Sequence, residues 1–151
     1  MKFVSSAVLF AALTMAAAPV LAQDFTGQVK ARQGQFRIMA INLGILGAVA
    51  KGEVAFDAAA VKRATDTLAA VSMIDQGPLW PKGSDNMAMD GTNALPAIWD
   101  NAGDLGAKWA AFGESVKGLQ AATDAATLGK ALGATGGTCK ACHDANRAPL
   151  G

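Results

Sequence analysis

Apolar residues recur at intervals of three and four along four stretches of this 151-residue chain. That spacing places them on one face of an α-helix, so each stretch is predicted to be helical. The predicted helices run roughly over Thr26–Lys51, Ala58–Ile74, Ala94–Ala122 and from residue 125 to about Arg147. Two connections are short and one is long, which is typical of an antiparallel four-helix bundle of the all-α class.

Residues that favour helix starts support these bounds. Asp57 and Asp124 are good N-caps for the second and fourth helices, and Phe56 is placed for a hydrophobic staple. Asn93 is a candidate cap for the third helix. The connection Asp75–Thr92 is rich in proline and glycine, and we expect it to be irregular.

Many glycines fall inside the predicted helices, where each costs up to about 1 kcal/mol relative to alanine. Either they reflect drift in a stable bundle, or they allow close backbone contacts or clear space for a large group. The glycines are Gly34, Gly44, Gly47, Gly103, Gly106, Gly113, Gly133, Gly136 and Gly137.

The first 22 residues differ from the rest of the chain. Lys2 precedes an apolar run over residues 4–20, and Val20-Leu21-Ala22 provides small residues on either side of Leu21 before a cleavage point. We interpret residues 1–22 as a cleaved signal peptide and residues 23–151 as a single mature domain. An uncleaved membrane anchor is the alternative interpretation.

Removing this segment changes the charge of the chain. The mature domain loses Lys2 and keeps 12 basic and 12 acidic residues, so its formal net charge is zero. Nucleic acids and anionic membrane surfaces attract an excess of basic residues, so neither is an expected partner. No mature segment has the length of a transmembrane helix. Alanine, the best helix former, supplies 27 of the 129 mature residues.

The sequence Cys139-Lys140-Ala141-Cys142-His143 is the C-x-x-C-H signature of c-type haem attachment. Cysteines three residues apart lie on one face of a helix, so both can form thioethers to one haem. His143 is then the expected axial ligand of the iron. One covalently attached haem c also agrees with a secreted protein in the bacterial periplasm.

Other interpretations of the two cysteines fit less well. A thioredoxin-like pair belongs at the start of a helix in a βαβ unit, whereas these cysteines come near the end of a helical chain. A structural zinc site needs about four ligands, but there is no third cysteine or second histidine. A plain disulfide leaves His143 without a role.

The second axial position of the iron has no obvious protein ligand. His143 is the only histidine, and no methionine follows it. A ligand would have to come from upstream, where Met39, Met73, Met87 and Met89 are the mature methionines.

Several short sequences resemble the cytochrome c′ family, the class II c-type cytochromes. They are Arg32-Gln33, Lys51-Gly52, Phe56-Asp57-Ala58, Ile98-Trp99 and the haem motif close to the C-terminus. The resemblance covers the whole mature chain and implies a four-helix bundle that forms a homodimer through its first two helices. It also implies five-coordinate, high-spin iron, with Phe36 covering the distal position. Met39, one turn further on, could line the distal cavity.

The resemblance assigns further residues to the haem. Arg32 and Gln33 are implied to contact a propionate, and Asn93 either does the same or only caps a helix. Arg147 is implied to lie beside His143 on the proximal side. The chain departs from the family at Asn146, where an aromatic residue is usual.

An apolar distal pocket offers no hydrogen bond to bound dioxygen, whereas nitric oxide and carbon monoxide need none. We therefore expect a periplasmic nitric-oxide-binding haem protein, not an enzyme, that buffers or removes nitric oxide. The alternative is a periplasmic electron carrier with an unknown redox partner. A peroxidase-like enzyme is a third possibility, but no distal histidine or arginine can be assigned to it.

Overall fold

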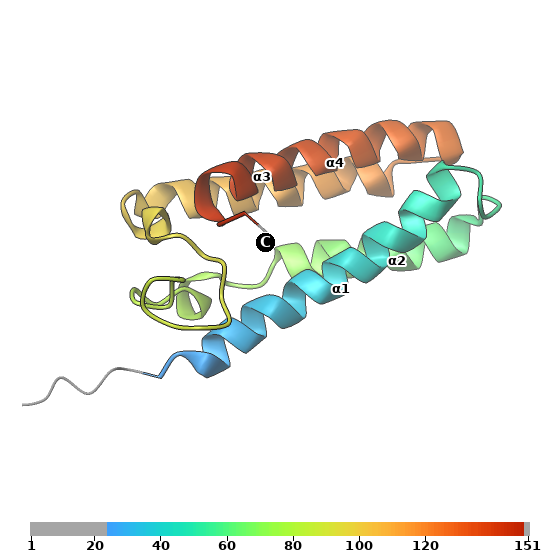
Figure 1. Ribbon diagram of the computed structural model, residues 1–151. Helices are drawn as coiled ribbons and strands as arrows, with labels where there is room; N and C mark the ends of the chain where they lie inside the picture. The colour runs from blue at the N-terminus through green and yellow to red at the C-terminus, as the bar shows by residue number, and fades with distance from the viewer. Residues whose placement is uncertain (1–23, 150–151) are drawn as a thin grey trace, which may run out of the picture.

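Four long helices dominate the computed structural model, which describes residues 24–149 (Figure 1). They are α1 (Thr26–Ala50), α2 (Ala58–Ser72), α3 (Ala102–Gln120) and α4 (Ala125–Asn146). Helices α1 and α3 each pack against both α2 and α4. The four-helix bundle predicted from the apolar spacing is thus confirmed. The predicted signal peptide, residues 1–22, lies outside the described residues.

Each helix contributes a fully buried leucine to the centre of the bundle. Leu46, Leu68, Leu119 and Leu128 come from α1 to α4 in turn and have 0% exposure. Burying one such side chain contributes about 1.5–3 kcal/mol, so this shared core holds the four helices together. Between residues 24 and 149, no helix is long and apolar enough to cross a membrane.

The predicted caps of α2 and α4 form as expected. The Asp57 carboxylate accepts a hydrogen bond from the backbone N–H of Ala59 at 2.9 Å. The Asp124 carboxylate accepts one from the backbone N–H of Thr127 at 2.8 Å, and the two residues complete a reciprocal capping box. These bonds satisfy backbone donors that a helix N-terminus otherwise leaves free.

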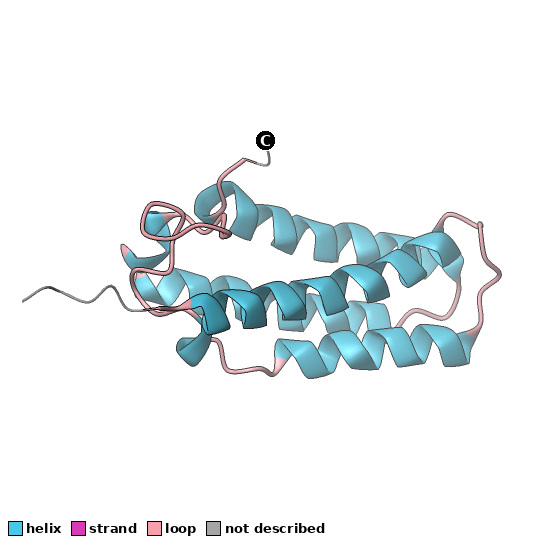
Figure 2. Ribbon diagram, turned by 60° about the horizontal axis from the view of Figure 1, so that its bottom comes forward, coloured by secondary structure: helices cyan, strands magenta, loops and turns pink. Residues whose placement is uncertain are grey.

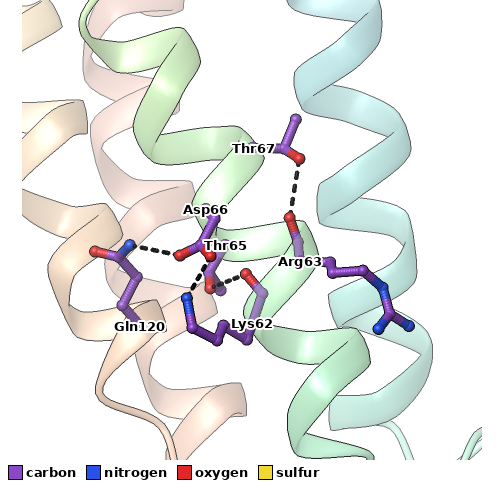
Figure 3. Close-up of polar contacts among 6 residues, drawn as sticks. All are labelled: Lys62, Arg63, Thr65, Asp66, Thr67 and Gln120. Atoms are coloured by element: carbon purple, nitrogen blue, oxygen red, sulfur yellow. Dashed lines mark hydrogen bonds and ion pairs between the residues drawn. The ribbon is translucent and has the colours of Figure 1, made fainter.

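A polar bridge joins α2 to α3 on the outside of the bundle (Figure 3). Asp66 accepts hydrogen bonds from Lys62 Nζ at 2.5 Å and from Gln120 Nε2 at 3.2 Å. The Lys62 and Asp66 side chains are well exposed, so solvent screens their ion pair and it contributes little to stability. The bridge therefore adds little to the buried contacts between the two helices.

The predicted third helix, Ala94–Ala122, starts too early. A 3₁₀ turn, η2 (Pro96–Trp99), comes first, and α3 begins only at Ala102. Asn93 does not cap a helix, and Asn101 takes the N-cap position without a side-chain hydrogen bond. The capping interpretation of Asn93 is wrong because backbone hydrogen bonds with the end of α4 hold residues 93–95 outside the helix. Leu95 N–H donates to the Asn146 carbonyl at 2.9 Å, for example.

Most of the helical glycines do not mark close contacts between helices. Seven of the nine would leave a new Cβ with no neighbour within 4 Å. At Gly113 a Cβ would lie 3.4 Å from the hydroxyl of Ser72 on α2, which is an ordinary van der Waals contact. Close approach between helices therefore does not require glycine at this position. Sequence drift and the need for space to hold a large group are both compatible with the seven glycines that have no such neighbour.

The long connection between α2 and α3 covers one end of the bundle. It contains a second 3₁₀ turn, η1 (Gly77–Leu79), and lies at the same end as the last turn of α4 (Figure 2). Asn93 and Ala148 are joined by a backbone hydrogen bond of 2.8 Å, and Ala94 forms an isolated bridge with Arg147. This end of the bundle thus brings the cysteine motif next to a polar loop.

Candidate haem site

Cys139 and Cys142 both lie on the last turns of α4 and are free thiols. Both side chains are half-buried, and burial is the main cause that raises the pKa of each thiol. The charge of Cys142 also raises the pKa of Cys139, and two residues three apart on α4 lie on the same side of the helix. The structure therefore brings the predicted pair together on one helix face.

His143 follows Cys142 and is half-buried. Burial lowers its pKa, the positive charge of Arg147 lowers it further, and Asp144 opposes this shift. A lowered pKa favours the neutral imidazole, which is the form that can coordinate a metal. His143 and the exposed Arg147 line a common hollow of about 440 Å³, together with Asp144, Ala148 and Pro149.

Arg32 reaches from α1 into the long connection. Its guanidinium donates to the hydroxyl and the carbonyl of Ser84, both at 2.8 Å, and to the Thr92 hydroxyl at 3.4 Å. It also lies over the Trp80 ring, 4.2 Å from the centroid. The side chain is only 3% exposed, yet no carboxylate among residues 24–149 forms an ion pair with it. Arg32 is therefore a buried cation whose partners in the described chain are neutral.

The two remaining polar candidates are exposed at the same end of the bundle. Gln33 donates from Nε2 to the Gly91 carbonyl at 2.6 Å. Asn93 uses its backbone carbonyl to accept from Ala148 N–H, which places it beside the end of α4. Both therefore border the long connection, and neither is held by a contact to the cysteine motif itself.

Phe36 is a half-buried residue of α1 that packs against the hydrophobic core. Its ring meets Trp109 of α3 edge-on, with centroids 6.3 Å apart and an interplanar angle of 75°.

An apolar cavity of about 470 Å³ also lies at this end of the bundle. It is lined by Ile74, Asp75, Gln76, Gly77, Trp80, Ile98, Trp99, Leu105, Gly106 and Trp109. All three indole N–H groups are hydrogen-bonded, Trp80 to Gln76, Trp99 to the Trp80 carbonyl and Trp109 to the Ser72 carbonyl. Cys139, Cys142 and His143 are not among the residues that line this cavity.

These features fit a c-type haem. Two free thiols on one helix face provide the attachment, and a histidine whose pKa is lowered provides an axial nitrogen. The sequence did not reveal the partners of Arg32, because Ser84 and Thr92 belong to no motif. Only the return of the long connection to α1 places them beside the guanidinium.

Comparisons with known proteins show the family to which this chain is similar. The sequence profile of the family Cytochrome C′ matches residues 27–147. A cytochrome c′ of Cereibacter sphaeroides is 41% identical over 146 residues, which cover 95% of this chain and 96% of the relative. A cytochrome c-554 of the same organism is 35% identical, covering 89% of this chain and 91% of the relative. The solved cytochrome c′ from Rhodobacter sphaeroides superposes with a TM-score of 0.77 at 37% identity, covering 85% of this chain and all of that one.

Proposed function

Since this chain belongs to the cytochrome c′ family, we propose that it is a periplasmic haem protein that binds nitric oxide and carbon monoxide. The proposal holds that it buffers or removes nitric oxide without acting as an enzyme. Two features together carry this proposal. The chain has a single histidine, His143 on α4, and the helix that packs beside it, α1, carries the aromatic residue Phe36. The predicted signal peptide supports the periplasmic location.

Cys139 and Cys142 would hold one haem c through thioethers, and His143 would provide the axial nitrogen. A haem bound in this way supplies an iron with one coordination position open to a small neutral ligand. Arg32, Gln33 and Asn93 all lie at this end of the bundle, and we propose that they bind the propionates. For Arg32 this would give a buried cation the anionic partner that the described residues do not supply.

Phe36 would restrict access to the distal side. The ring is held by its edge-on contact with Trp109 and by packing against the apolar core. A ligand must displace it, so ligands gain less binding energy than in an open pocket. On the other side, Arg147 shares a hollow with His143 and would influence ligands that approach from the proximal face.

The test is an absorption spectrum of the purified ferrous protein with and without nitric oxide. We expect a five-coordinate, high-spin spectrum that changes on addition of nitric oxide. A low-spin, six-coordinate spectrum without any response would contradict the proposal and favour electron transfer instead. One feature supports that alternative: Met39 is buried one turn after Phe36, and a thioether ligand is typical of electron-carrying cytochromes.

We also propose that the protein forms a homodimer through its first two helices, with α1 contributing the apolar contact. Ile38, Ile41 and Ile45 are 45%, 65% and 45% exposed, and their spacing places them on one outward face of this helix. Such a row is an unfavourable surface in a monomer, whereas a two-fold contact between copies of α1 would cover it.

Ile41→Glu is expected to weaken the dimer at least about a hundredfold, or ~3 kcal/mol, because two carboxylates would then be buried near the symmetry axis. Sedimentation velocity over a range of concentrations measures the change. Met87→Glu is the control, since Met87 is 81% exposed but lies in the long connection. Equal behaviour of the two variants would exclude α1 as the interface.

A further inference from the structure

Asn146 is a buried amide at the end of α4 whose groups contact three different parts of the site. The residue is 7% exposed, and its Nδ2 donates to Cys142 Sγ at 3.9 Å. Its backbone carbonyl accepts from Leu95 N–H at 2.9 Å, which ties it to the long connection. A polar residue this buried is stable only when its hydrogen bonds are made.

An ion pair on α3 completes the surroundings of this amide. Lys108 Nζ contacts both carboxylate oxygens of Asp104, and the two side chains are only 22% and 35% exposed. The Lys108 hydrogen bond is the main cause that lowers the pKa of Asp104, and the Asn146 amide lowers it slightly further. Asp104 and Lys108 also both influence the Cys142 thiol. The printed contacts of Asn146 thus join the Cys142 sulfur to the long connection, while the Asp104–Lys108 pair supplies the charges of α3 that act on the same thiol.

We propose that Asn146 is a positioning residue that fixes the Cys142 thioether against α3 and the long connection, and so helps set the reduction potential of the haem. The inference rests on the proposed attachment of haem at Cys142. A thioether sulfur remains a weak hydrogen-bond acceptor, so the contact can persist after attachment. An N–H donor at this sulfur withdraws electron density from the cofactor and favours its reduced form.

The experiment compares the haem-loaded wild-type protein with Asn146→Leu, Asn146→Asp and Asn146→Gln. Leucine keeps the volume without a donor, aspartate replaces the donor with a negative charge beside Asp104, and glutamine keeps the amide. Spectroelectrochemistry gives the reduction potential, proton NMR of the ferric form gives the haem methyl shifts, and thermal unfolding gives stability. Asn101→Leu is the matched control, because Asn101 is exposed at the N-cap of α3 and makes no side-chain cap bond.

We expect the potential to fall in Asn146→Leu and to fall further in Asn146→Asp, with the haem methyl shifts changing in both. Asn146→Gln should lie closer to the wild type, and Asn101→Leu should match it. If the leucine and aspartate variants lose thermal stability while potential and methyl shifts stay at wild-type values, Asn146 has only a packing role and the proposal is wrong. Should the leucine variant not accumulate, the isosteric aspartate variant decides by the same criteria.

The intact mass of the wild-type protein separates this inference from the proposed function. A wild-type mass without covalent haem would overturn the attachment at Cys142, and the role of Asn146 with it. A wild-type mass with haem, together with unshifted variants, would overturn the role of Asn146 alone.

Discussion

Replacing Phe36 with alanine is expected to raise the association constant of the ferrous protein for carbon monoxide by about 10- to 100-fold. In the wild type, a ligand must move the ring away from Trp109, which forfeits an aromatic pair worth about 0.5–1.5 kcal/mol. It also exposes part of a half-buried side chain, and full burial of a phenylalanine is worth about 1.5–3 kcal/mol. The alanine variant has neither cost, so ligand affinity rises by the corresponding factor.

Flash photolysis or stopped-flow mixing with carbon monoxide measures this change directly. Phe56→Ala is the matched control, because Phe56 is also a half-buried phenylalanine that packs on the core but lies before α2, at the other end of the bundle. It should lose stability without altering ligand affinity. If Phe36→Ala and Phe56→Ala bind carbon monoxide equally well, Phe36 does not cover the distal side.

Replacing Arg32 with leucine is expected to lower the free energy of unfolding by about 2–4 kcal/mol. The change removes three hydrogen bonds to Ser84 and Thr92 and the contact with the Trp80 ring. It also leaves the buried carbonyl of Ser84 without this donor. The loss of a buried donor network outweighs the gain from removing a desolvated charge, because the acceptors cannot reach water.

Urea unfolding of the haem-loaded protein tests this prediction. Arg37→Leu is the control, since Arg37 is an exposed arginine on the same helix. Arg32→Lys should fall between the two, because a lysine keeps the charge but cannot donate in two directions from a planar fork. Equal stabilities of Arg32→Leu and Arg37→Leu would show that the guanidinium does not organise the long connection.

Local chemistry explains which elements the sequence predicts well. The caps at Asp57 and Asp124 involve atoms within three residues of each other, so the residue types alone indicate them. The start of α3 differs from its predicted position because it depends on distant segments. Leu95 bonds to Asn146 and the Trp99 indole to the Trp80 carbonyl, and neither contact leaves a periodic signal.

The candidate site also has features that the sequence predicts and features that depend on distant contacts. The spacing of Cys139, Cys142 and His143 determines the attachment chemistry, because residues within about one turn of a helix have a fixed relative geometry. Apolar periodicity likewise determines the bundle, since four amphipathic helices must bury their faces together.

Three features depend on the tertiary structure alone. They are the neutral partners of Arg32, the contact of Phe36 with the Trp109 ring and the surroundings of the Asn146 amide. Arg32 meets Ser84 across 52 residues of chain, and Phe36 meets Trp109 from a different helix. Asn146 lies one turn from Cys142, but its backbone carbonyl is bound by Leu95 N–H from the long connection. Such contacts join different elements, so they depend on how the helices and the long connection pack.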